Sequence, residues 1–114
     1  MLSEHIQKKI IEKIKKENPQ KVILFGSYAS DKYHADSDID LYIVTNDRFL
    51  PRSFKEKMDV KMRFSRLLDS VRKDFPMDII VHTLPMHEKF IQLNSMFSRE
   101  IMQNGKLIYE ADNS

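Results

Sequence analysis

Hydrophobic positions in the chain follow two periodicities, one typical of helices and one typical of strands. Isoleucines recur at helical spacing over residues 3–18, after a serine placed to cap the helix and before Asn18-Pro19, which is placed to end it. Amphipathic patterns over residues 53–74 and 86–103 predict two longer helices. The chain is therefore expected to contain three helices separated by shorter segments.

Each of the two longer helices carries an apolar stripe that is expected to face the core, with basic residues on the opposite side. The stripe residues are Phe54, Met58, Leu68, Val71 and Phe75 in the first helix, and Phe90, Leu93, Phe97 and Ile101 in the second. Met62 and Met96 are spare apolar residues that suit a surface for a partner protein. Gly105 follows the second helix, where a C-capping glycine is common.

Four short runs predict β-strands between and after these helices. Residues 21–25 and 77–81 are mostly apolar, residues 38–44 alternate between apolar and polar, and residues 106–110 form a short final run. The order of elements is helix–strand–strand–helix–strand–helix–strand. This order predicts an α/β (α+β) fold with a small mixed sheet flanked by helices, in a single domain over residues 1–114.

Composition removes several classes of function. The 114 residues include no cysteine, which excludes disulfide frameworks, thiolate zinc sites and cysteine nucleophiles. With 19 basic and 17 acidic residues, the net charge of +2 does not indicate a surface dedicated to nucleic acid. No apolar run approaches the roughly 20 residues that cross a bilayer, and the N-terminus lacks an apolar signal core. The expectation is a cytoplasmic domain without a membrane partner.

Two aspartates in the second predicted strand are candidate metal ligands. Asp38 and Asp40 lie on one strand face, where their charges repel one another at a spacing of roughly 7 Å. A hard divalent cation such as Mg²⁺ reverses that penalty, because it prefers carboxylate oxygens. Asp78 lies in the otherwise apolar third strand, and it can join the same metals if the two strands are neighbours.

Gly26-Ser27 directly follows the first predicted strand and completes the pattern G-S-x10-D-x-D. A glycine at a strand end lets the backbone approach a ligand closely, and a helical turn starting at Ser27 directs N–H groups toward an anion. Taken alone, the Gly-Ser pair is explained by a turn, and the acidic residues by an exposed strand edge. Their joint spacing favours an anion cradle facing a metal site, as a nucleoside triphosphate requires.

The histidines carry a weaker signal. His82 follows Asp78 at same-face spacing and is within possible reach of the site, although a surface or loop position is the favoured interpretation. The other histidines show no spacing typical of metal ligands and are interpreted as structural.

These residues resemble a known superfamily. Leu24-Phe25-Gly26-Ser27-Tyr28-Ala29, followed by Asp36-Ser37-Asp38-Ile39-Asp40-Leu41, is similar to the motif of the DNA polymerase beta-like nucleotidyltransferases. The short chain resembles their minimal, MntA-type branch along nearly its whole length. The resemblance implies a polymerase beta-like nucleotidyltransferase fold.

The resemblance also implies residue roles. Asp38 and Asp40 would hold two Mg²⁺ ions, Asp78 would complete one metal site, and Gly26 and Ser27 would hold the triphosphate of ATP. Minimal members commonly act as antitoxins that transfer AMP to a tyrosine of a HEPN-domain ribonuclease toxin encoded nearby. The implied partner is therefore that toxin, with which a hetero-oligomer can form, and no direct binding of nucleic acid is expected.

The chain departs from the family at one place. Many members continue the Gly-Ser with Ala-Arg-Gly, whereas here Ala29 is followed by Ser30 and Asp31. A cation near the phosphates is missing at that position, and His34, Lys32 or a basic residue of the partner is available to replace it. The departure keeps a second hypothesis open, in which the protein is a non-catalytic antitoxin that neutralises the toxin by occlusion.

Overall fold

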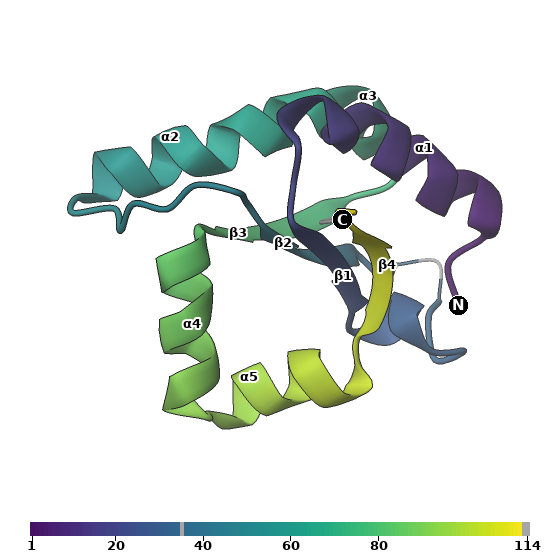
Figure 1. Cartoon of the computed structure of the whole chain (residues 1–114). Coiled ribbons are helices and arrows are strands. Elements are labelled where there is room, and N and C mark those ends of the chain that lie inside the picture. Colours follow the sequence, from purple (N-terminus) through teal and green to yellow (C-terminus); the bar gives the residue numbers. More distant parts are fainter. Residues whose placement is uncertain (35, 113–114) are drawn as a thin grey trace.

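A four-stranded mixed sheet organises the chain, with helices on both of its faces (Figure 1). The computed structural model describes residues 1–34 and 36–112. The strands are β1 (Lys21–Phe25), β2 (Ile39–Val44), β3 (Met77–His82) and β4 (Lys106–Glu110). The helices are α1 (Glu4–Ile14), α2 (Phe54–Ser65), α3 (Asp69–Arg72), α4 (Leu84–Leu93) and α5 (Met96–Arg99).

The strands lie in the spatial order β3-β2-β1-β4. β1 pairs antiparallel with β2 on one side and with β4 on the other, whereas β2 and β3 are parallel. A parallel pair needs a crossover connection, and the segment that carries α2 and α3 supplies it. This architecture confirms the predicted α/β fold with a small mixed sheet flanked by helices.

The main core lies between the sheet and the layer of α1, α2 and α3 (Figure 1). The alternation of β2 directs Ile39, Leu41 and Ile43 into this core, where all three are fully buried. Ile14 of α1 and Phe64 of α2 belong to the same cluster. The predicted first helix is confirmed, because Ser3 accepts a hydrogen bond from the N–H of Ile6 and so caps α1.

The opposite face of the sheet, covered by α4 and α5, holds a smaller apolar cluster. Its buried members are Ile23 and Phe25 of β1, Tyr42 and Val44 of β2, and Ile101. Asp40 lies two residues before Tyr42 in the same strand and therefore belongs to this face as well. The face with the smaller core is thus the one that carries the candidate chemistry.

The helix predicted over residues 53–74 is divided in two. After α2 the backbone tightens into a 3₁₀ turn at Arg66–Leu68 before α3 begins. The prediction that Phe54 faces the core was wrong, since its side chain is 77% exposed. Ser53 caps the helix, so Phe54 lies in its first turn, at the end of the helix. Leu68 and Val71 of the same stripe are buried, as predicted.

The prediction of one continuous helix over residues 86–103 was wrong. Asn94 adopts a left-handed conformation (φ 47°) that ends α4, and Ser95 caps the short α5 that follows. The break turns Leu93 outward, so that it is 74% exposed, whereas Ile101 stays fully buried. No helix among the described residues is long and apolar enough to cross a membrane.

Gly105 ends the π-helical turn Glu100–Asn104 that follows α5, so a glycine stands at the helix end as predicted, but for a different reason. Its φ of −70° is open to any residue, so no left-handed conformation requires glycine. Instead, a Cβ atom there would overlap the carbonyl oxygen of Ile101 and the side chain of Ile23. Close packing between the turn and β1 therefore explains this glycine.

We predict that Phe64→Ala and Phe54→Ala, made on the same helix, differ sharply in their effect on stability. Phe64 is fully buried in the main core, and its truncation is expected to lower the free energy of unfolding by about 3–5 kcal/mol. Phe54 is mostly exposed, and its truncation is expected to cost less than about 0.5 kcal/mol. Urea unfolding followed by circular dichroism measures both, and equal losses would contradict the placement of the core.

Candidate active site

The three predicted carboxylates lie at the same end of the β2–β3 pair. Asp40 and Asp78 are register partners in these parallel strands, and Asp38 lies one residue before β2 begins. Asp40 is half-buried, whereas Asp38 and Asp78 are exposed. The prediction that Asp78 lies on the strand next to Asp40 is therefore confirmed. The two residues are far apart in the sequence, and no local pattern specifies that their strands pair.

The Gly26-Ser27 loop packs directly on Asp40. β1 ends at Phe25, which is the register partner of Asp40 in the antiparallel β1–β2 pair. Gly26 then adopts a backbone conformation (φ 74°, ψ −156°) that other residues rarely accept, and a Cβ atom there would overlap Oδ2 of Asp40. The two halves of the G-S-x10-D-x-D pattern thus meet in space.

A single helical turn follows this glycine. Residues Ser27–Ala29 form a 3₁₀ turn, in which the N–H of Ala29 donates to the carbonyl oxygen of Gly26 at 3.1 Å. The turn that was expected to begin at Ser27 is therefore present. It is one turn long, and its residues Ser27 and Ala29 line a pocket.

The pocket at this turn has a volume of about 580 Å³. Its lining residues come from the loop after β1 (Gly26, Ser27, Ala29, Ser30 and Lys32) and from the helical turn after α5 (Glu100 and Asn104). The pocket lies beside Asp40, since Gly26 contacts both. A volume of this size accommodates a nucleotide.

The electrostatics of the site reflect the crowding of carboxylates. The pKa of Asp40 is raised to about 6. Burial is the largest cause, followed by the negative charges of Asp78 and Asp38. The charges of Asp78 and Asp38 therefore act on Asp40, and three carboxylates lie at this end of the sheet. Such a site attracts cations.

The donor set fits a hard divalent ion, because carboxylate oxygens are the ligands that Mg²⁺ prefers and a cation would relieve the repulsion around Asp40. In the part of the chain that the structure describes, no group of three or more His, Asp or Glu side chains is arranged to hold a metal ion. The assignment of Asp38, Asp40 and Asp78 as metal ligands stays a prediction.

A second polar cluster on the same sheet face was not predicted from the sequence. The hydroxyl of Tyr42 lies 2.9 Å from Nδ1 of His82 and 2.8 Å from Nδ1 of His87, and Phe90 stacks on the Tyr42 ring. The pKa of His82 is lowered to about 4. Burial is the largest cause, followed by the charges of His87 and Lys57. His82 is therefore a neutral, structural partner of Tyr42 at neutral pH and not a member of the carboxylate group.

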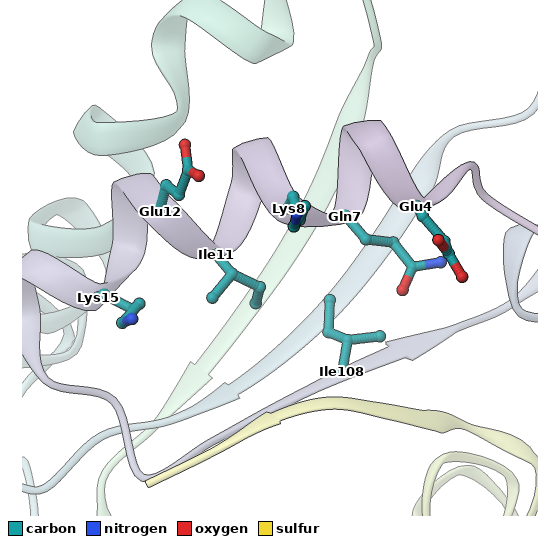
Figure 2. Close-up of a pocket in the computed structure, with 7 residues that line it drawn as sticks. All are labelled: Glu4, Gln7, Lys8, Ile11, Glu12, Lys15 and Ile108. Carbon is teal, nitrogen blue, oxygen red and sulfur yellow. The ribbon is translucent and has the colours of Figure 1, made fainter.

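A separate hollow of about 460 Å³ lies on the other face of the sheet, between α1 and β4. Figure 2 shows Ile11 of α1 and Ile108 of β4 pointing toward one another across it, with Gln7 and Lys8 along the helix. None of the predicted site residues lines this hollow, and the main core separates it from Asp40. We therefore place the candidate site at the pocket beside Gly26.

Comparison with known families agrees with the motif and the fold. The profile of the polymerase beta nucleotidyltransferase family matches residues 8–114. The chain belongs to this family. No curated protein sequence matches the chain at a significant level.

Solved structures with a similar fold come from toxin–antitoxin complexes. A chain of a toxin–antitoxin complex with AMP-PNP superposes with a TM-score of 0.60 at 19% identity, covering 93% of this chain and 74% of that chain. A chain of a mutant MntA-HpeT toxin–antitoxin complex gives a TM-score of 0.53 at 16% identity, covering 97% and 76%. At these identities the likeness establishes that the fold is shared.

We predict that Gly26→Ala disrupts the site through Asp40. The alanine would occupy a backbone region that costs about 1–3 kcal/mol and would push the Asp40 carboxylate away. A double-mutant cycle with Asp40→Ser, measured by urea unfolding, separates the two effects. The cost of Gly26→Ala should shrink but not vanish when Asp40 is absent, and an unchanged cost would show that the two residues are not in contact.

We also predict a pH-dependent stability that originates in the burial of His82. An unfolded His82 titrates near 6.5, and burial lowers its pKa to about 4 in the fold. The unfolded chain therefore binds more protons between these values, so this contribution is fully present above about pH 6.5 and is lost as the pH falls toward 4. We expect a loss of about 1 kcal/mol, because the site is partly open to solvent and screening reduces the effect.

The measurement is the melting temperature between pH 4 and 8 for the wild type, His82→Gln and His5→Gln. The His82→Gln profile should be flatter at the acidic end, while the change at the exposed His5 should leave the profile unaltered. Parallel profiles for the wild type and His82→Gln would contradict the assignment.

Proposed function

We propose that this protein is a Mg²⁺-dependent nucleotidyltransferase that transfers AMP from ATP to a hydroxyl, most simply a tyrosine, of a HEPN-domain ribonuclease toxin encoded nearby. The protein would thereby act as the antitoxin of the pair. The observation that carries this proposal is the packing of the Gly26-Ser27 loop on Asp40, with Asp78 in register beside it. This arrangement places an anion-binding loop next to carboxylates that suit a metal.

In the proposed reaction the oxygen of the acceptor hydroxyl attacks the α-phosphorus of ATP. A new P–O bond forms to the acceptor, the bond from the α-phosphorus to the bridging oxygen breaks, and pyrophosphate leaves with that electron pair. Two Mg²⁺ ions, held by Asp38, Asp40 and Asp78, would stabilise the negative charge on the attacking and leaving oxygens.

The chain's own residues have distinct roles in this scheme. Gly26 and Ser27 would hold the triphosphate at the pocket beside Asp40, which keeps the α-phosphorus close to the carboxylates. Asp78 is exposed at the edge strand β3, where an acceptor from another protein can reach it. Asp78 would orient the acceptor hydroxyl and take its proton.

Two observations support a protein acceptor. The structural neighbours include a toxin–antitoxin complex with AMP-PNP, which links this fold to both a toxin and a nucleotide. The break at Asn94 leaves Leu93 and Met96 at 74% and 81% exposure, on the side of the molecule where α4 and α5 cover the sheet face of Asp40. We propose that these apolar side chains belong to the surface that the toxin covers.

A non-catalytic antitoxin is the alternative function. The replacement of the family's arginine by Ser30-Asp31 favours it, because triphosphate binding loses a cation at that position. In that case the exposed apolar surface of α4 and α5 would be sufficient to neutralise the toxin by occlusion, and the carboxylates would be dispensable.

We predict that Asp38→Asn abolishes AMP transfer while the protein remains folded. The substitution removes one charge from the metal-binding group, and Asp38 is exposed, so packing is not disturbed. The experiment incubates the purified toxin with ATP, Mg²⁺ and either variant, and weighs the toxin by mass spectrometry. The wild type should add one or more AMP masses and silence the ribonuclease, and the variant should reduce the transfer rate by at least about 100-fold.

Two controls make this experiment decisive. Asp69→Asn changes an aspartate on α3, whose side chain pairs with Arg72 far from the pocket, and transfer should continue at the wild-type rate. Replacing Mg²⁺ by EDTA should stop transfer by the wild type. Full neutralisation of the toxin by Asp38→Asn, without added AMP, would instead establish the occlusion mechanism.

A further inference from the structure

The loop after Ser27 lacks the arginine that many family members carry, but it contains two other basic residue types, Lys32 and His34. Lys32 is the only basic side chain that lines the pocket of Gly26 and Ser27 among the described residues. His34 does not line this pocket, and its Nδ1 instead accepts a hydrogen bond from the backbone N–H of Asp36 at 3.2 Å. Of these two residues, only Lys32 lines the pocket.

The loop is closed in a way that fixes the backbone of Lys32 relative to the Gly-Ser turn. The hydroxyl of Ser30 donates to the carbonyl oxygen of Ser27 at 3.2 Å and accepts from the N–H of Lys32 at 3.3 Å. Around this bridge, the rings of Tyr28 and Tyr33 stack with their centroids 4.7 Å apart. The stack joins the residues on either side of Ser30–Lys32, so the position of Lys32 is set by the same turn that begins at Ser27.

The charges around Lys32 leave it available for an anion. Its neighbour Asp31 does not line the pocket and pairs with the ammonium group of Met1 at 2.9 Å. No carboxylate lies within salt-bridge distance of Lys32 in the residues described. Glu100 is the acidic residue that lines the pocket, and it accepts a hydrogen bond from the side-chain amide of Asn104 at 2.7 Å.

We infer that Lys32 binds the phosphates of the nucleotide and replaces the missing arginine of the loop. This inference rests on the proposed nucleotidyl transfer and deepens it. Glu100 also lines the pocket and would repel an anion, so the polyphosphate would lie closer to the loop that carries Ser27 and Lys32. A lysine acts as a point charge on a flexible side chain, so its contact with phosphate contributes less binding energy than that of a bidentate arginine. The contribution is expected to be larger for a nucleotide with more phosphates.

The experiment compares the binding of ATP and of AMP in the presence of Mg²⁺, by calorimetry, for the wild type, Lys32→Ala, Lys32→Arg and Lys9→Ala. Lys9 is an exposed lysine on α1 that does not line the pocket, and it controls for the loss of one positive charge. Lys32→Ala should weaken ATP about tenfold and AMP less than about twofold. Lys32→Arg should restore ATP binding to within about threefold of the wild type, and Lys9→Ala should change neither nucleotide.

The outcomes separate the role of Lys32 from the proposed function itself. If the wild type binds ATP and Lys32→Ala binds it equally well, the assignment of Lys32 is overturned while the nucleotidyltransferase proposal stands. Equal weakening of ATP and AMP, together with a lower melting temperature, would show a structural role and would also overturn it. If the wild type binds no ATP, the proposed function fails and the role of Lys32 fails with it.

Discussion

The contact between Gly26 and Asp40 is the constraint on which the rest of the candidate site depends. The antiparallel pairing of β1 and β2 brings the end of β1 onto Asp40, and only a glycine leaves room for the carboxylate there. The same glycine, with its positive φ, turns the chain out of the sheet and starts the short turn at Ser27. The position of the pocket, and of every residue in its loop wall, follows from this one close approach.

One face of β2 contributes to the hydrophobic core, and the other carries a residue of the candidate site. On one face three fully buried aliphatic side chains each contribute roughly 1.5–3 kcal/mol through burial. On the other face Asp40 is partly withdrawn from water beside two further carboxylates, which raises its pKa and opposes folding at neutral pH. The alternation of a single strand therefore supplies the stability that allows like charges to be held together.

Much of this arrangement could be predicted from the sequence, because it follows local patterns. The strands were visible as apolar or alternating runs, and the meeting of Gly26 with Asp40 was implied by a fixed spacing on consecutive strands. The end of α4 at Asn94 was missed, since the apolar positions continue at helical spacing across it. The partners of Tyr42 were missed because they lie 40 and 45 residues away and no periodicity connects them. The selection of Lys32 over His34 also required the structure, because it depends on how the loop closes.

The hydroxyl of Tyr42 has a single proton, yet it stands between two imidazole Nδ1 atoms. It can donate to only one of them, so the other ring must carry its own hydrogen on Nδ1 and donate to the phenol oxygen. With both rings neutral, His82 and His87 are therefore held in opposite tautomers, and reversing one ring requires reversing the other. The strand β3 and the helix α4 are thus joined by a chain of two hydrogen bonds through Tyr42. The direction of this chain depends on the tautomers of both histidines together.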